Sequence, residues 1–240
     1  MRKRTWLIAC LLAASAVARS GGGDVDKIKE EIRAARADKE LMSDAKAISG
    51  KAKRWVETLW DAAGSAKEAE ERWNALILAQ EASGLGADKE LAKWRGKIRT
   101  KILSEYADDA KKMGSLMGVT SDEETRNAIF AATKNGSVKA ACLYSELSPL
   151  FAAARKGDLS SEDRKKLEET LARIQKDFGN EVDTRNRKWG DVAAGRLRAM
   201  NDLLVGKVAP EIEGKDLDGT PFKLSDYRGK VVVLDFWGNW

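Results

Sequence analysis

The sequence predicts a mainly α-helical protein, with a helical domain over residues 24–204 and the start of an α/β unit over 206–240. The first range contains a single proline, Pro149, and is dominated by Ala, Leu, Lys, Glu and Arg, which favour helices. Apolar residues recur there at spacings of three and four, as in a helix that buries one face. After Val205 the composition changes to Gly, Pro and β-branched residues, which is typical of turns and strands.

The helical domain is expected to hold seven or eight helices joined by short loops. The clearest apolar stripes cover residues 41–59, 91–102, 167–178 and 189–204. Capping-box patterns predict helix starts at 65–68 and 121–124, and glycines predict helix ends at Gly64, Gly136, Gly157 and Gly179. Helix pairs such as 137–157 with 160–178 leave open a divergent, tetratricopeptide-like repeat bundle, for which no repeated signature is visible.

Residues 1–18 predict a secretory signal peptide. A basic start (Arg2, Lys3, Arg4) is followed by an apolar run at 5–17 and an Ala-Val-Ala cleavage pattern at 16–18. An N-terminal helix that stays with the fold is the open alternative. The stretch Leu-Ile-Ala-Cys at 7–10 has the form of a lipidation site, but only Thr5 and Trp6 separate it from the basic cluster, which disfavours a lipoprotein. We therefore expect export to the periplasm or cell envelope.

Charge and cysteine content exclude several classes of function. The chain has 43 basic and 38 acidic residues, and three of the basic ones lie in the first four positions, so the body is nearly neutral. A nucleic-acid-binding protein needs an excess of basic residues on one face, so we do not expect this chain to bind nucleic acid. After removal of residues 1–18 one cysteine, Cys142, and no histidine remain, which excludes an internal disulfide, a cysteine/histidine metal site and histidine-based catalysis.

Cys142 and the tryptophans are expected to serve packing. Cys142 lies in an apolar helical stretch and is interpreted as a small buried hydrophobic residue rather than a reactive thiol. Five tryptophans fall on or beside the apolar stripes, and anchoring of helix contacts is favoured over an aromatic ligand pocket: Trp55, Trp60, Trp73, Trp94 and Trp189.

The C-terminal segment has the pattern of a hairpin followed by a buried strand. Residues 211–217 and 220–224 are expected to pair around a two-residue Asp218-Gly219 turn, with Pro221 placing the second strand at an edge. Residues 225–227 suit a short helical turn. The continuous apolar run at 231–234 predicts a strand covered on both faces, as in the parallel part of an α/β sheet.

This segment resembles the start of a thioredoxin-like redoxin domain. The matching pieces are, in order, GKVAP (206–210), DLDG (216–219) and LSDYRGKVVVLDFW (224–237). The resemblance is to the TlpA/ResA type of envelope thiol–disulfide oxidoreductases, with the peroxide-reducing AhpC/TSA group as a related branch. It covers residues 206–240 only, and the preceding helical region can be likened only to the helical N-terminal regions of some such proteins.

In that family the strand is followed by Trp-Cys-x-x-Cys, so the resemblance implies that this chain stops one residue before the nucleophilic cysteine. The family's first cysteine lies at a helix N-terminus, where the helix dipole lowers the thiol pKa, and the second cysteine resolves the mixed disulfide. The resemblance implies an accessory proton relay at Asp235 and an active-site rim formed by Trp237 and Trp240. TlpA-type relatives often have asparagine at the position of Asp235, which puts the relay in doubt.

The functional expectation is an exported redoxin-family thiol–disulfide oxidoreductase or thiol peroxidase, inactive as given because the cysteine pair is missing. Its partners would be protein disulfides or thiol redox proteins. No cofactor is implied, because the family's chemistry resides in its own sulfurs. The alternative is an envelope interaction protein whose helical domain binds a protein partner and whose redoxin segment is vestigial. The 240 residues are expected to be a fragment or a shortened gene model, since a hairpin and one strand form no stable sheet.

Overall fold

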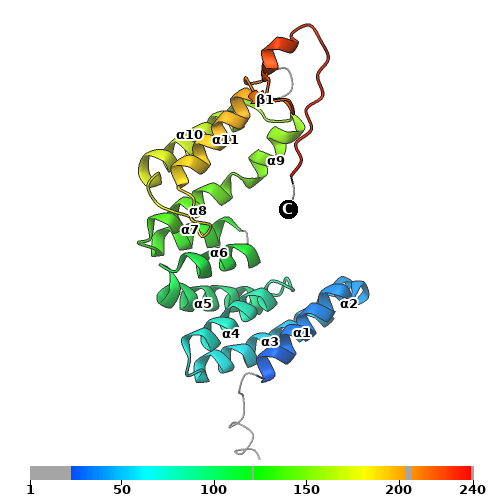
Figure 1. The fold of residues 1–240 in the computed structure, drawn as a ribbon. Helices are drawn as coiled ribbons and strands as arrows, with labels where there is room; N and C mark the ends of the chain where they lie inside the picture. Colours follow the sequence, from blue (N-terminus) through cyan, green and yellow to red (C-terminus); the bar gives the residue numbers. More distant parts are fainter. Residues whose placement is uncertain (1–22, 121, 204–206, 239–240) are drawn as a thin grey trace, which may run out of the picture.

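The computed structural model describes residues 23–120, 122–203 and 207–238. The predicted fold class is confirmed, because eleven helices occupy 23–202 and only a two-stranded sheet and a short 3-10 helix follow in the described part of the chain. Figure 1 shows the helices stacked along one long axis, with the C-terminal hairpin at the end that carries α9 and α11 and the run after it turning back from that end. The repeat hypothesis stays a prediction.

The first helices are α1 (Gly23–Ala37), α2 (Lys39–Ser43), α3 (Ala45–Ser65), α4 (Ala69–Ser83), α5 (Lys89–Tyr106) and α6 (Ala110–Val119). They are followed by α7 (Glu123–Ala132), α8 (Gly136–Glu146), α9 (Ser148–Lys156), α10 (Ser161–Phe178) and α11 (Trp189–Asp202). The described residues thus hold more helices than the seven or eight expected. One reason is that Asp44 ends α2 and caps α3, which divides the stripe at 41–59.

Side-chain caps explain where most of these helices begin. Five helices start with an aspartate whose carboxylate accepts a backbone N–H of the first turn: Asp38, Asp44, Asp88, Asp109 and Asp122. The predicted start at 121–124 is therefore confirmed, with Asp122 as the cap. The predicted start at 65–68 is wrong, because Ser65 is the last residue of α3 and α4 begins after Glu68 without a side-chain cap.

The predicted helix ends are partly correct. Gly157 ends α9 in the left-handed conformation (φ 80°), as expected of a C-terminal glycine, and Gly179 follows α10. Gly64 lies inside the last turn of α3. Gly136 is the first residue of α8, where the side chain of Asn135 caps the helix, so its predicted role as a helix end is wrong.

The helical domain contains two apolar cores that meet at Phe130. The first spans α1 to α8 and the second joins α8, α10 and α11, while Phe130 packs against both. Trp55, Trp73 and Trp189 are buried, and Trp60 and Trp94 pack on each other with ring centroids 5.6 Å apart. The packing role expected for the tryptophans is therefore confirmed.

Two turns of the same design appear far apart in the chain. At 183–187 and at 216–220 an aspartate accepts backbone N–H groups two and four residues ahead, and the fourth residue adopts a positive φ. That residue is Asn186 in the first turn and Gly219 in the second, with φ of 59° and 82°. Both are types that tolerate the left-handed conformation.

The second of these turns joins β1 (Glu213–Lys215) to β2 (Pro221–Lys223), which pair antiparallel. The hairpin and its edge proline are confirmed. The two-residue turn is wrong, because Asp216 N donates to Thr220 O and leaves a three-residue loop with glycine in its last position. The 3-10 helix η1 (Leu224–Tyr227) confirms the helical turn expected at 225–227.

Residues 231–238 form no regular secondary structure, so the strand predicted at 231–234 is wrong for this structure. Val231 and Val233 are 97 % and 88 % exposed. A strand requires a hydrogen-bonded neighbour, and the described residues provide none for this run.

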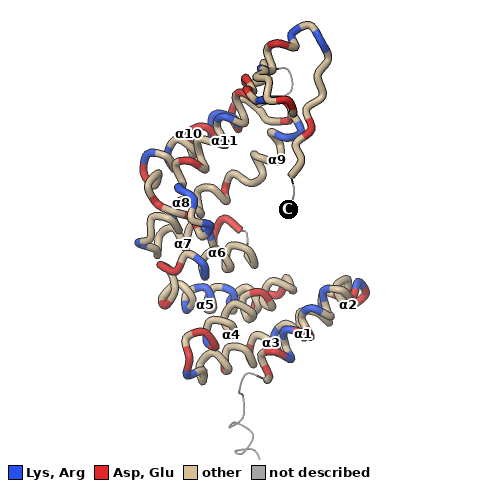
Figure 2. Tube along the Cα trace, viewed as in Figure 1, with Lys and Arg blue, Asp and Glu red and all other residues tan. Residues whose placement is uncertain are grey.

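Figure 2 shows Lys and Arg interspersed with Asp and Glu along the chain trace. This agrees with the nearly neutral body inferred from the sequence. None of the described helices is long and apolar enough to span a bilayer.

Candidate functional site

The segment 207–230 is organised by short-range contacts around Glu211. Its carboxylate accepts the backbone N–H of Ser225 at 2.9 Å, and Leu224 N donates to Ile212 O at 2.9 Å. The hydrogen bonds from Ser225 hold the pKa of Glu211 below its ordinary value. These contacts tie the 3-10 helix to the hairpin and fix where the run from Val231 leaves it.

The residues assigned to a redox site lie on the exposed run that follows. Asp235 is exposed and Trp237 is 83 % exposed, and neither contacts the hairpin through a hydrogen bond recorded in the described part of the chain. Trp240 lies outside the described residues. The structure therefore does not bring these residues together, and their roles stay predictions.

Cys142 is the cysteine of the helical domain, and it is buried. Its side chain is 4 % exposed, and its sulfur lies 3.9 Å from the sulfur of Met117. Burial raises the pKa of the Cys142 thiol from 9.0 to about 11, against a smaller opposing effect of Arg126. A thiol with this pKa is almost wholly protonated at neutral pH, so the prediction that Cys142 is a packing residue is confirmed.

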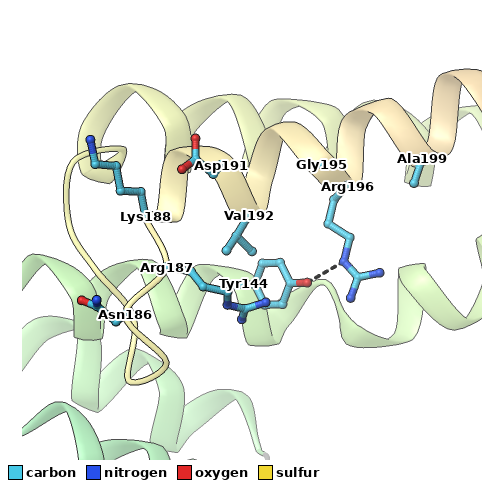
Figure 3. A pocket seen from close by; sticks show the side chains of 9 residues that line it. All are labelled: Tyr144, Asn186, Arg187, Lys188, Asp191, Val192, Gly195, Arg196 and Ala199. Atoms are coloured by element: carbon cyan, nitrogen blue, oxygen red, sulfur yellow. Dashed lines mark hydrogen bonds between the residues drawn. The ribbon is translucent and has the colours of Figure 1, made fainter. Parts of the chain in front are cut away.

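A groove of about 650 Å³ lies between α8, the turn at 183–187 and α11, which lines it from Asp191 to Ala199. Figure 3 shows the side chains of Arg187 and Arg196 converging on Tyr144 from the turn and from α11. A second hollow of about 360 Å³ adjoins it and shares these three residues, and its lining includes Met117 and Ala141.

Tyr144 and its neighbours hold Arg196 in one orientation. The Arg196 Nε–H donates to the Tyr144 hydroxyl at 2.6 Å, and the guanidinium lies 5.1 Å from the Phe151 ring centroid. Tyr144 is itself packed between Phe151 and Trp189, at centroid distances of 5.3 and 5.5 Å. Within the described residues, no carboxylate forms an ion pair with Arg196 and no hydrogen bond is recorded for its Nη atoms.

Arg187 is already neutralised by Asp183. Its Nε and Nη2 both donate to Asp183 Oδ2, at 2.9 and 2.7 Å, while Asp183 Oδ1 accepts the backbone N–H groups of Arg185 and Arg187. Burial alone would raise the pKa of Asp183, but these hydrogen bonds lower it below its ordinary value. Asp183 therefore stays ionised and is paired with Arg187, whereas Arg196 forms no ion pair within the described residues.

No local sequence pattern predicts this groove. Tyr144 and Arg196 are 52 positions apart, so no local pattern connects them. The available signal was the cluster Arg185-Asn186-Arg187-Lys188, three basic residues around an asparagine that favours turns.

Comparisons with known proteins match short stretches of the chain. The model of the AhpC/TSA family matches residues 205–240. The proteins named Thiol-disulfide oxidoreductase ResA from Geobacillus thermodenitrificans and Geobacillus kaustophilus are 53 % and 56 % identical over 38 residues, which is 16 % of this chain and 22 % of each relative. The ResA of Bacillus thuringiensis subsp. konkukian is 47 % identical over 46 residues, 19 % of this chain and 27 % of that relative.

The matched region thus spans about a quarter or less of the length of these relatives. No solved structure matches the chain. The C-terminal segment is similar to thioredoxin-like redoxins at the level of the family, and these matches cover no more than 46 residues of the chain.

Proposed function

We propose that this protein is an exported thiol–disulfide oxidoreductase of the TlpA/ResA type, with a helical domain placed before its redoxin domain. The observation that carries the proposal is the identity of 53 % over 38 residues to a named thiol–disulfide oxidoreductase. The hairpin and 3-10 helix at 213–227 support it, because they place the run from Val231 directly after a self-contained β-unit. Protein disulfides or thiol redox proteins are the proposed substrates.

The exchange chemistry requires a Cys-x-x-Cys pair, and the 240 residues contain no such motif. The proposal therefore requires a complete redoxin domain that carries this pair, with Asp235 as an accessory proton relay and Trp237 and Trp240 at the active-site rim. Sequencing of the gene through this region tests it. A stop codon followed by unrelated sequence in every frame would contradict it.

Residues 19–240, which remain after the predicted signal peptide, are proposed to lack exchange activity, because their one cysteine, Cys142, is buried and its thiol is protonated. Reduction of insulin by this chain with dithiothreitol as donor should equal the rate with dithiothreitol alone. Turnover above that rate, undiminished by Cys142→Ser, would show that another group carries out exchange.

Export is proposed from residues 1–18. Expression in a bacterial host with a C-terminal tag tests it. The mature protein should appear in the periplasmic fraction, and its N-terminus should begin at residue 19. Cytoplasmic retention of the full-length chain would contradict export.

A second candidate is an envelope interaction protein whose helical domain binds another protein. The groove at Tyr144 and Arg196 favours it, because a fixed cation without an acidic partner is suited to binding an anionic group. The two candidates are compatible if the helical domain holds a partner for the redoxin domain.

A further inference from the structure

We propose that the groove between α8 and α11 binds a protein segment in which a carboxylate side chain stands next to an apolar one. The carboxylate is received by Arg196 and Tyr144, and the apolar neighbour enters the adjoining hollow. No residue of this groove belongs to 205–240, so the inference goes beyond the proposed redox function and does not depend on it.

Arg196 has the properties of a carboxylate receptor. Its Nε–H donates to the Tyr144 hydroxyl at 2.6 Å, and its guanidinium carbon lies over the Phe151 ring at 5.1 Å from the centroid, so two contacts restrain the side chain. The two Nη groups remain able to donate to a carboxylate, and two parallel N–H···O bonds are the geometry in which arginine binds this group best. Holding the side chain in advance reduces the rotamer entropy that binding would otherwise cost.

Tyr144 adds a third donor. Its oxygen accepts from Arg196, so its own O–H is free to donate into the groove. Its packing against Phe151 and Trp189 keeps the hydroxyl in place. An anionic group at this point would meet guanidinium and hydroxyl donors together.

The charges around the groove favour an anion. The two hollows are lined by Arg185, Arg187, Lys188 and Arg196 and by the acidic residues Asp183 and Asp191. Asp183 is fully engaged by Arg187 and by the turn backbone. Asp191 is the other acidic residue of the lining and is outnumbered by Arg185, Lys188 and Arg196, which leaves a positive excess.

The shape favours a peptide over a small inorganic anion. The groove of about 650 Å³ has the size of sites that bind ligands much larger than phosphate. Its floor includes Val192 and Ala199, and the adjoining hollow includes Met117, Val138 and Ala141. Arg196 lines both the groove and the adjoining hollow. A bound peptide that crosses Arg196 can therefore place a carboxylate on its guanidinium and a neighbouring apolar side chain in the hollow.

The test uses the full chain and a fluorescein-labelled nonapeptide with a central Leu-Glu pair, measured by fluorescence anisotropy. A matched peptide with Leu-Gln should bind about ten-fold more weakly, because it lacks the charge that Arg196 receives. Arg196→Met should weaken binding of the Leu-Glu peptide about ten-fold, and Arg196→Lys should also weaken it, since lysine keeps the charge without the planar fork. Tyr144→Phe should weaken it about three-fold by releasing Arg196 while retaining the ring.

Arg198→Met provides the matched control. Arg198 lies two residues along α11, pairs with Asp202 and does not line the groove, so this variant removes the same charge without touching the site. Its affinity should stay within two-fold of that of the unmodified chain. Circular dichroism should show unchanged helix content in every variant.

Three results would overturn the proposal. Equal loss of affinity in Arg198→Met and Arg196→Met would mean binding through net charge alone. Equal affinity for the Leu-Glu and Leu-Gln peptides would mean that the groove does not recognise the carboxylate. No measurable binding of either peptide would mean that the groove does not bind such a segment. Displacement of the peptide by millimolar inorganic phosphate would identify a simple anion site.

Discussion

The burial of Cys142 yields a quantitative prediction for thiol labelling. In a Cys10→Ser variant, Cys142 is the one thiol of the chain, and its reaction with iodoacetamide at pH 8 can be followed by mass spectrometry. A rise of its pKa from 9.0 to about 11 lowers the thiolate fraction at this pH by about ninety-fold. The stronger nucleophilicity of a more basic thiolate restores about eight-fold, so ionisation alone slows labelling about ten-fold.

Access limits labelling by a second route. Cys142 is 4 % exposed in α8, so a reagent that cannot reach it in the folded state must wait for local opening, and an opening free energy of about 2 kcal/mol slows this route about thirty-fold. Because opening exposes the thiol and restores its ordinary pKa, the two factors do not multiply, and we expect the folded chain to react about ten- to thirty-fold more slowly than the same chain in 8 M urea at equal pH. A difference of less than about three-fold would refute both the buried position and the raised pKa, and with them the assignment of Cys142 to packing.

Three further predictions concern stability, measured by urea unfolding. Gly157→Ala should destabilise the chain by about 1 kcal/mol because its φ of 80° is left-handed, whereas Gly50→Ala, in open space within α3, should stabilise it by about 0.5–1 kcal/mol. Ser137→Ala should cost about 1–3 kcal/mol, because the buried Trp189 indole N–H loses its acceptor at 3.0 Å. The chain has no histidine, so stability should be nearly constant between about pH 6 and 8. Stability should fall below about pH 4, because several carboxylates have a lower pKa in the folded chain than in the unfolded chain. Their contribution to stability is present above the unfolded pKa and is lost as the pH falls through the folded pKa. These carboxylates are Asp88, Asp108, Asp122, Asp183 and Glu211.

Each of these has an outcome that contradicts it. Equal signs for the two glycine substitutions would mean that backbone conformation does not decide their effect. Unchanged stability of Ser137→Ala would mean that the indole finds another acceptor. A stability maximum below pH 4 would reverse the sign expected from the carboxylates.

Helix boundaries show how far local sequence reasoning reaches. The start of α7 was predictable because Asp122 and the residues after it form the cap from neighbouring positions alone. The same pattern failed at Ser65, which packs as the last residue of α3 and donates to the carbonyl oxygens of Asp61 and Ala62. Whether a serine ends one helix or starts the next depends on which neighbour the chain packs against, and the pattern does not contain this information.

The sequence by itself determined the helical class, the hairpin at 213–223, the packing role of Cys142 and the similarity of the last residues to redoxins. These features depend on short spacings, on composition or on a contiguous motif, all of which are local properties of the chain. Only the tertiary structure decided that the run from Val231 has no strand partner in the described residues, and that Tyr144 and Arg196 meet across 52 positions. Strand pairing and convergent sites depend on which distant segments lie side by side, and the packing of the helices sets that arrangement.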